Sequence, residues 1–193
     1  MKTNLITFAI AAAAAALLSS CATNDPVTQV NSANARASDI ARESRAALSS
    51  LYSEDPNARA LGRRAKGVLV FPAIVKGGLI VGAQAGNGAM IRGGEITGYY
   101  QTVSASYGLQ AGVQKFGYAL FLMDNEALRN LDKTEGWEIG SSPNVVVLDQ
   151  GKATSLSTRT ATHGTYAYFF DQRGLMAGLA LQGTKITRIH PRG

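Results

Sequence analysis

The sequence predicts an α+β fold, in which a curled, largely antiparallel β-sheet or partial barrel carries N-terminal helices and one short helix. From residue 68 onward, short runs rich in β-branched and bulky apolar residues alternate with turn signals. The region before them instead places apolar residues at helical spacing. Because the connections between the expected strands are mostly local, antiparallel pairing is favoured.

The N-terminal segment is expected to direct export and lipidation. Lys2 precedes an apolar run over residues 5–18, which is shorter than the roughly 20 residues needed to span a bilayer. Leu18-Ser19-Ser20-Cys21 resembles a bacterial lipobox, in which the cysteine is lipidated and becomes the new N-terminus. We therefore expect a lipoprotein signal peptide over residues 1–20, acyl chains such as palmitate on Cys21, and a lipidated tether over residues 21–31.

Two further features bear on where the protein acts. Ala22, and not aspartate, follows the cysteine, and by the bacterial sorting pattern this implies a lipid-anchored protein of the outer membrane that faces the periplasm. Residues 32–193 suit a single domain, and a chain of this size buries about 70% of its unfolded surface without disulfides. The net charge of +6 permits an anionic partner, although many basic proteins bind nothing through their charge.

Two helices are expected before the sheet. The first has apolar residues at helical spacing, ends near Tyr52, and is expected to pack on the sheet, since its polar face mixes charges of both signs. Asp55-Pro56 opens the second, with Asp55 as its N-cap and Pro56 in its first turn. The apolar positions of the first helix are Ala37, Ile40, Ala41, Ala47, Leu48 and Leu51.

Basic residues cluster on the second helix and just after it. Arg59, Arg63 and Lys66 share one face, and Arg64 flanks them. Like charges at this spacing repel by a few tenths of a kcal/mol, so the cluster is mildly unfavourable unless an anion lies nearby. Cations at the end of a helix also complement its dipole. The residues alone leave these two interpretations open.

The following stretch is expected to contain two strands and a turn. Strands over residues 68–71 and 80–81 are separated by Pro72, Lys76 and a glycine pair, and Gly86-Asn87-Gly88 is expected to form the turn. Such dense glycines mark bulges, bends or closely packed backbones. Later elements are expected as follows: two or three strands within 96–123, a helix over 125–131 capped by Asp124, strands over 145–148, 153–160, 163–170 and 175–181, and turns over 149–152 and 171–174.

No residue pattern for catalysis or cofactor binding is found. His163 and His190 are the only histidines, so no transition-metal cluster is expected. His163 lies near several hydroxyl residues but without an ordered triad. The glycines around Asn87 lack the remaining residues of a dinucleotide or phosphate loop. We expect no catalytic residue, metal or cofactor and no nucleic-acid partner. A third alternative is an enzyme that acts on lipid and uses His163.

Several separated motifs resemble the SYLF domain, a lipid-binding module. They are Ala65-Lys66-Gly67 with four apolar residues, Lys76-Gly77-Gly78 with three apolar residues and Gly86-x-Gly88, the 121–125 segment FLMDN, and the 174–183 segment GLMAGLALQG. The resemblance covers residues 35–189. It implies a non-enzymatic, membrane-anchored lipoprotein that binds anionic phospholipid headgroups, with Arg59, Arg63, Arg64, Lys66 and Lys76 as lipid-binding residues. The alternative is a structural or interaction module of the cell envelope that binds a protein or cell-wall partner.

Overall fold

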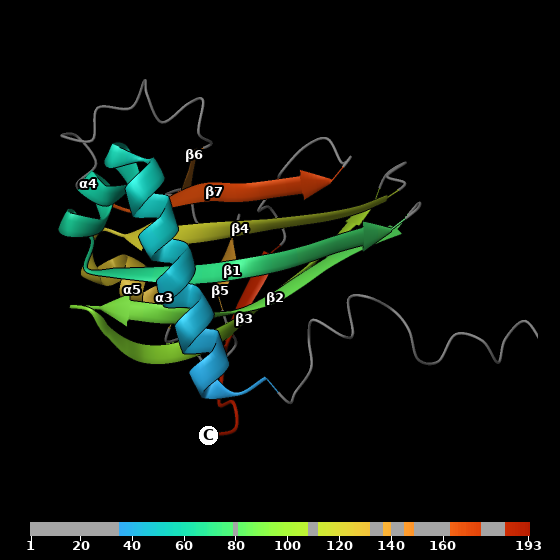
Figure 1. The fold of residues 1–193 in the computed structure, drawn as a ribbon, viewed down its shortest axis with the longest axis horizontal. Coiled ribbons are helices and arrows are strands. Elements are labelled where there is room, and N and C mark those ends of the chain that lie inside the picture. Colours follow the sequence, from blue (N-terminus) through green and yellow to red (C-terminus); the bar gives the residue numbers. More distant parts are fainter. Residues whose placement is uncertain are drawn as a thin grey trace, which may run out of the picture.

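The computed structural model describes residues 35–78, 81–107, 112–131, 137–139, 145–148, 163–174 and 184–193 (Figure 1). No helix in these ranges combines the length and apolar character needed to cross a membrane. The described helices are α3 (Ala37–Glu54), α4 (Pro56–Arg64) and α5 (Asn125–Leu131). The strands are β1 (Gly67–Gly78), β2 (Val81–Arg92), β3 (Glu95–Tyr107), β4 (Gly112–Leu122), β5 (Trp137–Ile139), β6 (Val145–Leu148), β7 (Thr165–Gly174) and β8 (Thr184–Ile189).

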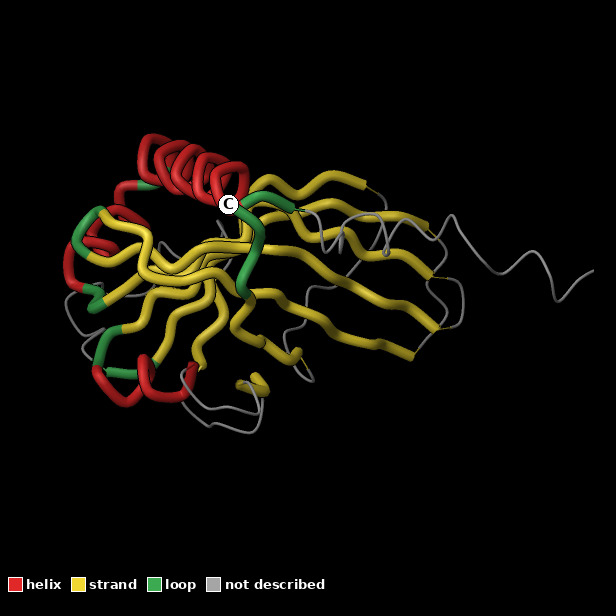
Figure 2. The backbone as a smooth tube through the Cα atoms, turned by 90° about the horizontal axis from the view of Figure 1, so that it is seen from below, coloured by secondary structure: helices red, strands yellow, loops and turns green. Residues whose placement is uncertain are grey.

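The described strands form one curled sheet in the order β5-β8-β3-β2-β1-β4-β7-β6. Neighbouring strands pair antiparallel, except that β6 runs parallel to β7. Figure 2 shows α3 and α5 on opposite faces of this sheet. The predicted α+β fold with a curled, largely antiparallel sheet is confirmed.

Each face of the sheet has its own apolar core. On the face covered by α3 and α4, Leu51 and Leu61 pack with Val70 and Phe121. On the face that carries α5, Leu131 packs with sheet residues that include Tyr118 and Phe169. Side chains alternate between the faces along each strand, so strands buried on both sides lack a simple polar–apolar alternation.

The predicted helices are confirmed, and capping residues explain where α4 and α5 begin. α3 buries Ile40, Leu48 and Leu51 against the sheet, as its apolar spacing predicted. The carboxylate of Asp55 accepts hydrogen bonds from the backbone N–H groups of the first turn of α4. Asp124 does the same for α5. A capping carboxylate satisfies N–H groups that have no partner within the helix.

The turn predicted at Gly86-Asn87-Gly88 is wrong. β2 runs straight through these residues, and the reversal lies at Gly93 and Gly94, which both have positive φ angles. β1 likewise continues past Pro72 by means of an irregular register between Phe71 and Ile74. A Cβ on Gly88 would lie 2.3 Å from the carbonyl oxygen of Val70. The glycines therefore serve the other role expected of them, the close approach of two backbones.

A second correction concerns the end of β7. Residues 171–174 were predicted as a turn, yet they continue the strand, and Asp171 adopts a positive φ of 56°. A register shift against β4 between Lys115 and Gly117 accommodates this conformation. The sequence also left β5 and β8 unpredicted. The predicted elements over 149–160 and 175–181, the signal peptide and the tether lie outside the described residues.

Candidate functional site

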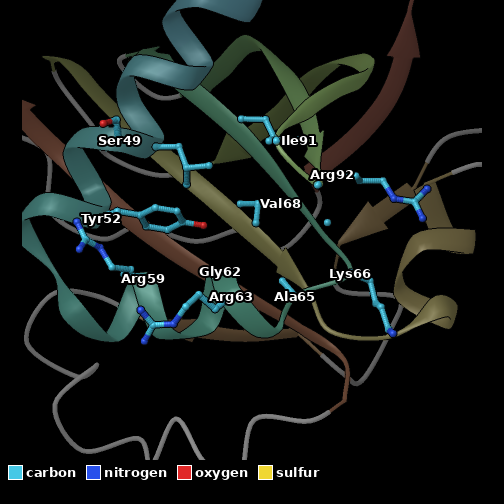
Figure 3. Close-up of a pocket in the computed structure, with 14 residues that line it drawn as sticks. Ser49, Tyr52, Arg59, Gly62, Arg63, Ala65, Lys66, Val68, Ile91 and Arg92 are labelled. Carbon is cyan, nitrogen blue, oxygen red and sulfur yellow. The ribbon is translucent and has the colours of Figure 1, made fainter.

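A pocket lies where α3, α4 and the first residues of β1 meet the β2–β3 turn; we call it the entrance pocket. Its volume is about 620 Å³, which is within the range typical of small-molecule sites. Figure 3 shows Tyr52 and Val68 at its centre, with basic side chains around them. The lining residues are Leu48, Ser49, Tyr52, Arg59, Gly62, Arg63, Ala65, Lys66, Gly67, Val68, Ile91, Arg92, Gly93 and Gly94.

Basic side chains surround the opening of the entrance pocket. Three cations predicted from the sequence, Arg59, Arg63 and Lys66, line it together with Arg92. All four are exposed. In Figure 3, Arg59 and Arg63 lie on one side of the pocket, and Lys66 and Arg92 lie on the other. Arg64 is also exposed, at the end of α4, but does not line the pocket.

These four cations are not neutralised by acidic side chains of the described chain. Ion pairs between described residues include those of Arg42 with Asp39, Arg45 with Glu95 and His163 with Asp124. None of them involves Arg59, Arg63, Lys66 or Arg92. The opening therefore presents clustered positive charge to solvent, which suits an anionic ligand.

Contacts of Asp55 fix the helix that carries Arg59 and Arg63. One carboxylate oxygen accepts from the N–H groups of Asn57 and Ala58, at 2.7 and 3.1 Å. The other accepts from the hydroxyl of Tyr168, which belongs to β7 and is fully buried. The start of α4 is thus tied both to its own backbone and to the sheet.

The floor of the entrance pocket is apolar and depends on Gly62. Leu48 and Val68 are buried there, and the ring of Tyr52 lies across α4. A Cβ on Gly62 would lie only 1.8 Å from the hydroxyl oxygen of Tyr52. Partial burial raises the pKa of Tyr52 to about 12, so its hydroxyl stays protonated at neutral pH.

The β2–β3 turn forms another wall and is attached to α3. Arg45 donates a hydrogen bond to the carbonyl of Gly94 and lies 3.8 Å from the carboxylate of Glu95. The register of β1 with β2 places Arg92 beside the start of β1, where its Cγ would lie 3.0 Å from a Cβ on Gly67. Sequence reasoning missed Arg92, because only the register of β1 with β2 brings it near Lys66.

Lys76 does not join this cluster. It lies ten residues beyond Lys66, roughly 30 Å along a strand, and only 7% of it is exposed. Its neighbours across the sheet are Gln84 and Gln114, which are also buried. Lys76 is thus part of a buried polar row and does not lie on the surface around the entrance pocket.

His163 lies beside a capping residue. Its Nδ1 is 3.7 Å from Asp124, and its side chain is 86% exposed. Asp124 also accepts from the N–H groups of Ala127 and Gly164, and these bonds hold the pKa of Asp124 below its usual value. These contacts explain Asp124 as the cap of α5. Within the described residues, no group of three or more histidine, cysteine, aspartate and glutamate side chains could hold a metal ion.

Comparison with known proteins finds one family model that matches part of the chain. No curated protein matches the chain. Residues 103–190 match the family model Ysc84, described as "Las17-binding protein actin regulator", and this is the SYLF domain family. The matched region extends from within β3 to just beyond β8. Over these residues the predicted resemblance to the SYLF family is confirmed. The match supports a lipid-binding or actin-regulator-like interaction module.

Proposed function

We propose that this protein is a non-enzymatic, membrane-anchored lipoprotein whose SYLF domain binds the headgroups of anionic phospholipids at the entrance pocket. Arg59, Arg63, Lys66 and Arg92 contact the phosphates. The observation that carries this proposal is the gathering of four exposed cations, without an ion pair in the described chain, around one pocket. Arg64 adds positive charge beside them, and Lys76 is left out because it is buried.

The energetics of such a site are favourable next to a membrane. Each cation close to an anionic surface contributes about 1 kcal/mol at modest salt. Arginine adds geometry, because its guanidinium can donate two parallel hydrogen bonds to one phosphate. Bound phosphate also relieves the mutual repulsion of the clustered cations.

The lipid anchor complements this weak affinity. Acylation of Cys21 in the lipobox would hold the protein at the outer membrane, facing the periplasm. The local concentration of headgroups is then high, so that weak binding by the domain suffices. In this proposal the anchor fixes the location and the domain selects the lipid.

A second candidate function is an interaction module of the cell envelope that binds a protein or cell-wall partner. The family description names a protein-binding role, and the matched residues 103–190 lie outside α3 and α4. In this alternative, the basic residues around the entrance pocket only keep the domain soluble.

Vesicle co-sedimentation separates the two functions. Residues 22–193 contain every described helix and strand, so this unlipidated chain keeps the described fold. We expect it to bind vesicles that contain phosphatidylglycerol or phosphatidic acid but not vesicles of pure phosphatidylcholine. Binding should weaken as the salt concentration rises. Changing Arg59, Arg63 and Lys66 to Glu should abolish binding.

The matched control changes Lys115, Arg129 and Lys185 to Glu, three exposed cations that do not line the entrance pocket. It alters the net charge equally and should retain most of the binding. Equal loss of vesicle binding in both triple variants would show that binding depends on net charge and not on the entrance pocket. Vesicle binding that does not depend on anionic lipid, on salt concentration or on either set of substitutions would refute the proposal and favour the interaction module.

A further inference from the structure

The entrance pocket is amphipathic, and this feature goes beyond a site for headgroups alone. Its floor consists of the side chains of Leu48 and Val68, the ring of Tyr52, and the half-buried Ile91. The four cations that line the pocket are exposed, whereas Leu48 and Val68 are buried. One pocket therefore combines exposed positive charge with an apolar lining.

A flat anionic membrane surface would contact the opening and leave the floor unused. A phosphate group is small compared with a cavity of about 620 Å³. Water over the apolar floor would be released if a hydrocarbon segment lay there, and about 25 cal/mol is gained for each Å² of apolar surface buried. The shape therefore favours a ligand with an anionic end and an apolar continuation.

Polar groups at the floor fit the junction of such a ligand. The Tyr52 hydroxyl lies above Gly62, in the place that a side chain on this residue would take. It has no hydrogen-bond partner among the described residues, and it can donate to an ester oxygen. In Figure 3 the Tyr52 hydroxyl points toward Val68, and both residues line the entrance pocket.

We propose that the entrance pocket binds one lipid molecule, with a phosphate monoester between the cations and the start of one acyl chain over the floor of Tyr52, Val68 and Ile91. This inference rests on the proposed function and specifies its ligand. A phosphate monoester has the compact, doubly ionisable headgroup that several clustered cations can surround at once. The ligand class is therefore phosphatidic acid and its lyso form.

The test uses soluble lipid, so that no membrane surface is present. Titration calorimetry of residues 22–193 with short-chain lysophosphatidate below its micelle concentration should detect binding at least about tenfold tighter than binding of glycerol 3-phosphate, which has the same headgroup without a chain. Short-chain lysophosphatidylcholine, with the chain but without net charge, should bind as weakly as glycerol 3-phosphate.

Two variants probe the floor without changing a cation. Ser49 lies one turn after Arg45, on the side of α3 that faces Gly94, so Ser49→Trp should fill the cavity and lower the affinity for lysophosphatidate at least about tenfold. Ile91→Thr should weaken it severalfold. Ala46→Trp, at an exposed position of α3 outside the pocket, is the control and should bind normally.

The outcomes separate this inference from the proposed function. If both inferences hold, Ser49→Trp no longer binds soluble lysophosphatidate but still sediments with anionic vesicles at low salt. The triple variant of Arg59, Arg63 and Lys66 then binds neither soluble lysophosphatidate nor anionic vesicles. Equal affinity for lysophosphatidate and glycerol 3-phosphate, or undiminished binding by a folded Ser49→Trp protein, would overturn the single-lipid site and leave headgroup binding intact. If the triple variant still binds anionic vesicles, the proposed function itself is refuted.

Discussion

The hydroxyl of Tyr168 donates to the carboxylate of Asp55, a residue 113 positions earlier in the chain. Asp55 ends α3 and caps α4, while Tyr168 belongs to β7 and is fully buried. A single carboxylate therefore joins the corner between the two helices to the sheet. Because α4 carries Arg59 and Arg63, this contact also fixes one side of the entrance pocket.

Removal of the Tyr168 hydroxyl should destabilise the domain and loosen α4. Hydrogen bonds to charged groups contribute about 1.5–3 kcal/mol, so Tyr168→Phe should lower the free energy of unfolding by about 1.5 kcal/mol in urea titration. Tyr166→Phe is the control, since Tyr166 lies on the same strand and its hydroxyl has no hydrogen-bond partner among the described residues. Similar losses in both variants would show that the contact with Asp55 contributes nothing specific.

A double-mutant cycle tests the contact between Tyr52 and Gly62. Gly62→Ala in a helix ordinarily gains about 1 kcal/mol, but here the new Cβ would collide with the Tyr52 hydroxyl. We expect no gain in the wild-type background and a gain of up to about 1 kcal/mol when Tyr52 is already Ala. Thermal and urea unfolding of the four proteins measure this coupling. Equal stabilisation in both backgrounds would place the Tyr52 ring elsewhere.

Much of the fold could be predicted because its signals are local. Asp55-Pro56 and Asp124 predict where α4 and α5 begin, because a capping side chain needs only the N–H groups of the next turn. The apolar spacing of α3 likewise depends only on helix geometry. The cations Arg59, Arg63 and Lys66 could be grouped for the same reason, as neighbours on one helical face and its continuation.

What could not be predicted depends on partner strands. Glycine permits both a turn and a close contact between backbones, and only the close approach of the Val70 carbonyl to Gly88 decides between them. Arg92 lies far from α4 in the sequence and joins the site through strand register. The burial of Lys76 follows from the faces of three adjacent strands. β8 is rich in β-branched residues, namely Thr184, Ile186, Thr187 and Ile189, and this local signal could have been recognised.

Gly88→Ala and Gly77→Ala should differ in their effect on the stability of the domain. A Cβ on Gly88 would meet backbone that cannot rotate away, so Gly88→Ala should destabilise the domain by about 1–3 kcal/mol. The nearest atom to a Cβ on Gly77 is 3.9 Å away, so Gly77→Ala should be neutral or stabilising by up to about 1 kcal/mol. Urea unfolding of both variants checks this. Equal effects would mean that the backbones of β1 and β2 do not approach closely at Gly88.

The contribution of Asp124 to stability should depend on pH. Backbone N–H groups of Ala127 and Gly164 lower its pKa in the folded protein. Its stabilisation is therefore complete above the pKa of an unfolded aspartate, near 4, and is lost as pH falls through the lower folded-state pKa. Asp124→Asn should cost about 1 kcal/mol at pH 7, and the difference should shrink in acid. Urea titrations across pH measure it.

A control for this pH dependence is Glu126→Gln, an exposed change in the first turn of α5 that leaves both hydrogen bonds of Asp124 in place. Its effect on stability should be smaller than that of Asp124→Asn at pH 7. If the loss in Asp124→Asn stays constant from pH 7 into acid, the charge of Asp124 is not what stabilises the start of α5.

Lys76 and Arg92 should respond oppositely to removal of their charge. Lys76→Gln changes a side chain buried between Gln84 and Gln114, so it should alter stability while anionic vesicle binding by the folded fraction stays within about twofold of wild type. Arg92→Gln changes an exposed side chain at the entrance pocket. It should leave stability within about 0.5 kcal/mol but weaken vesicle binding about fivefold, the loss of about 1 kcal/mol. Co-sedimentation and urea unfolding of both proteins provide the comparison. Weaker lipid binding by well-folded Lys76→Gln, with none in Arg92→Gln, would move the lipid site away from the entrance pocket toward the buried polar row.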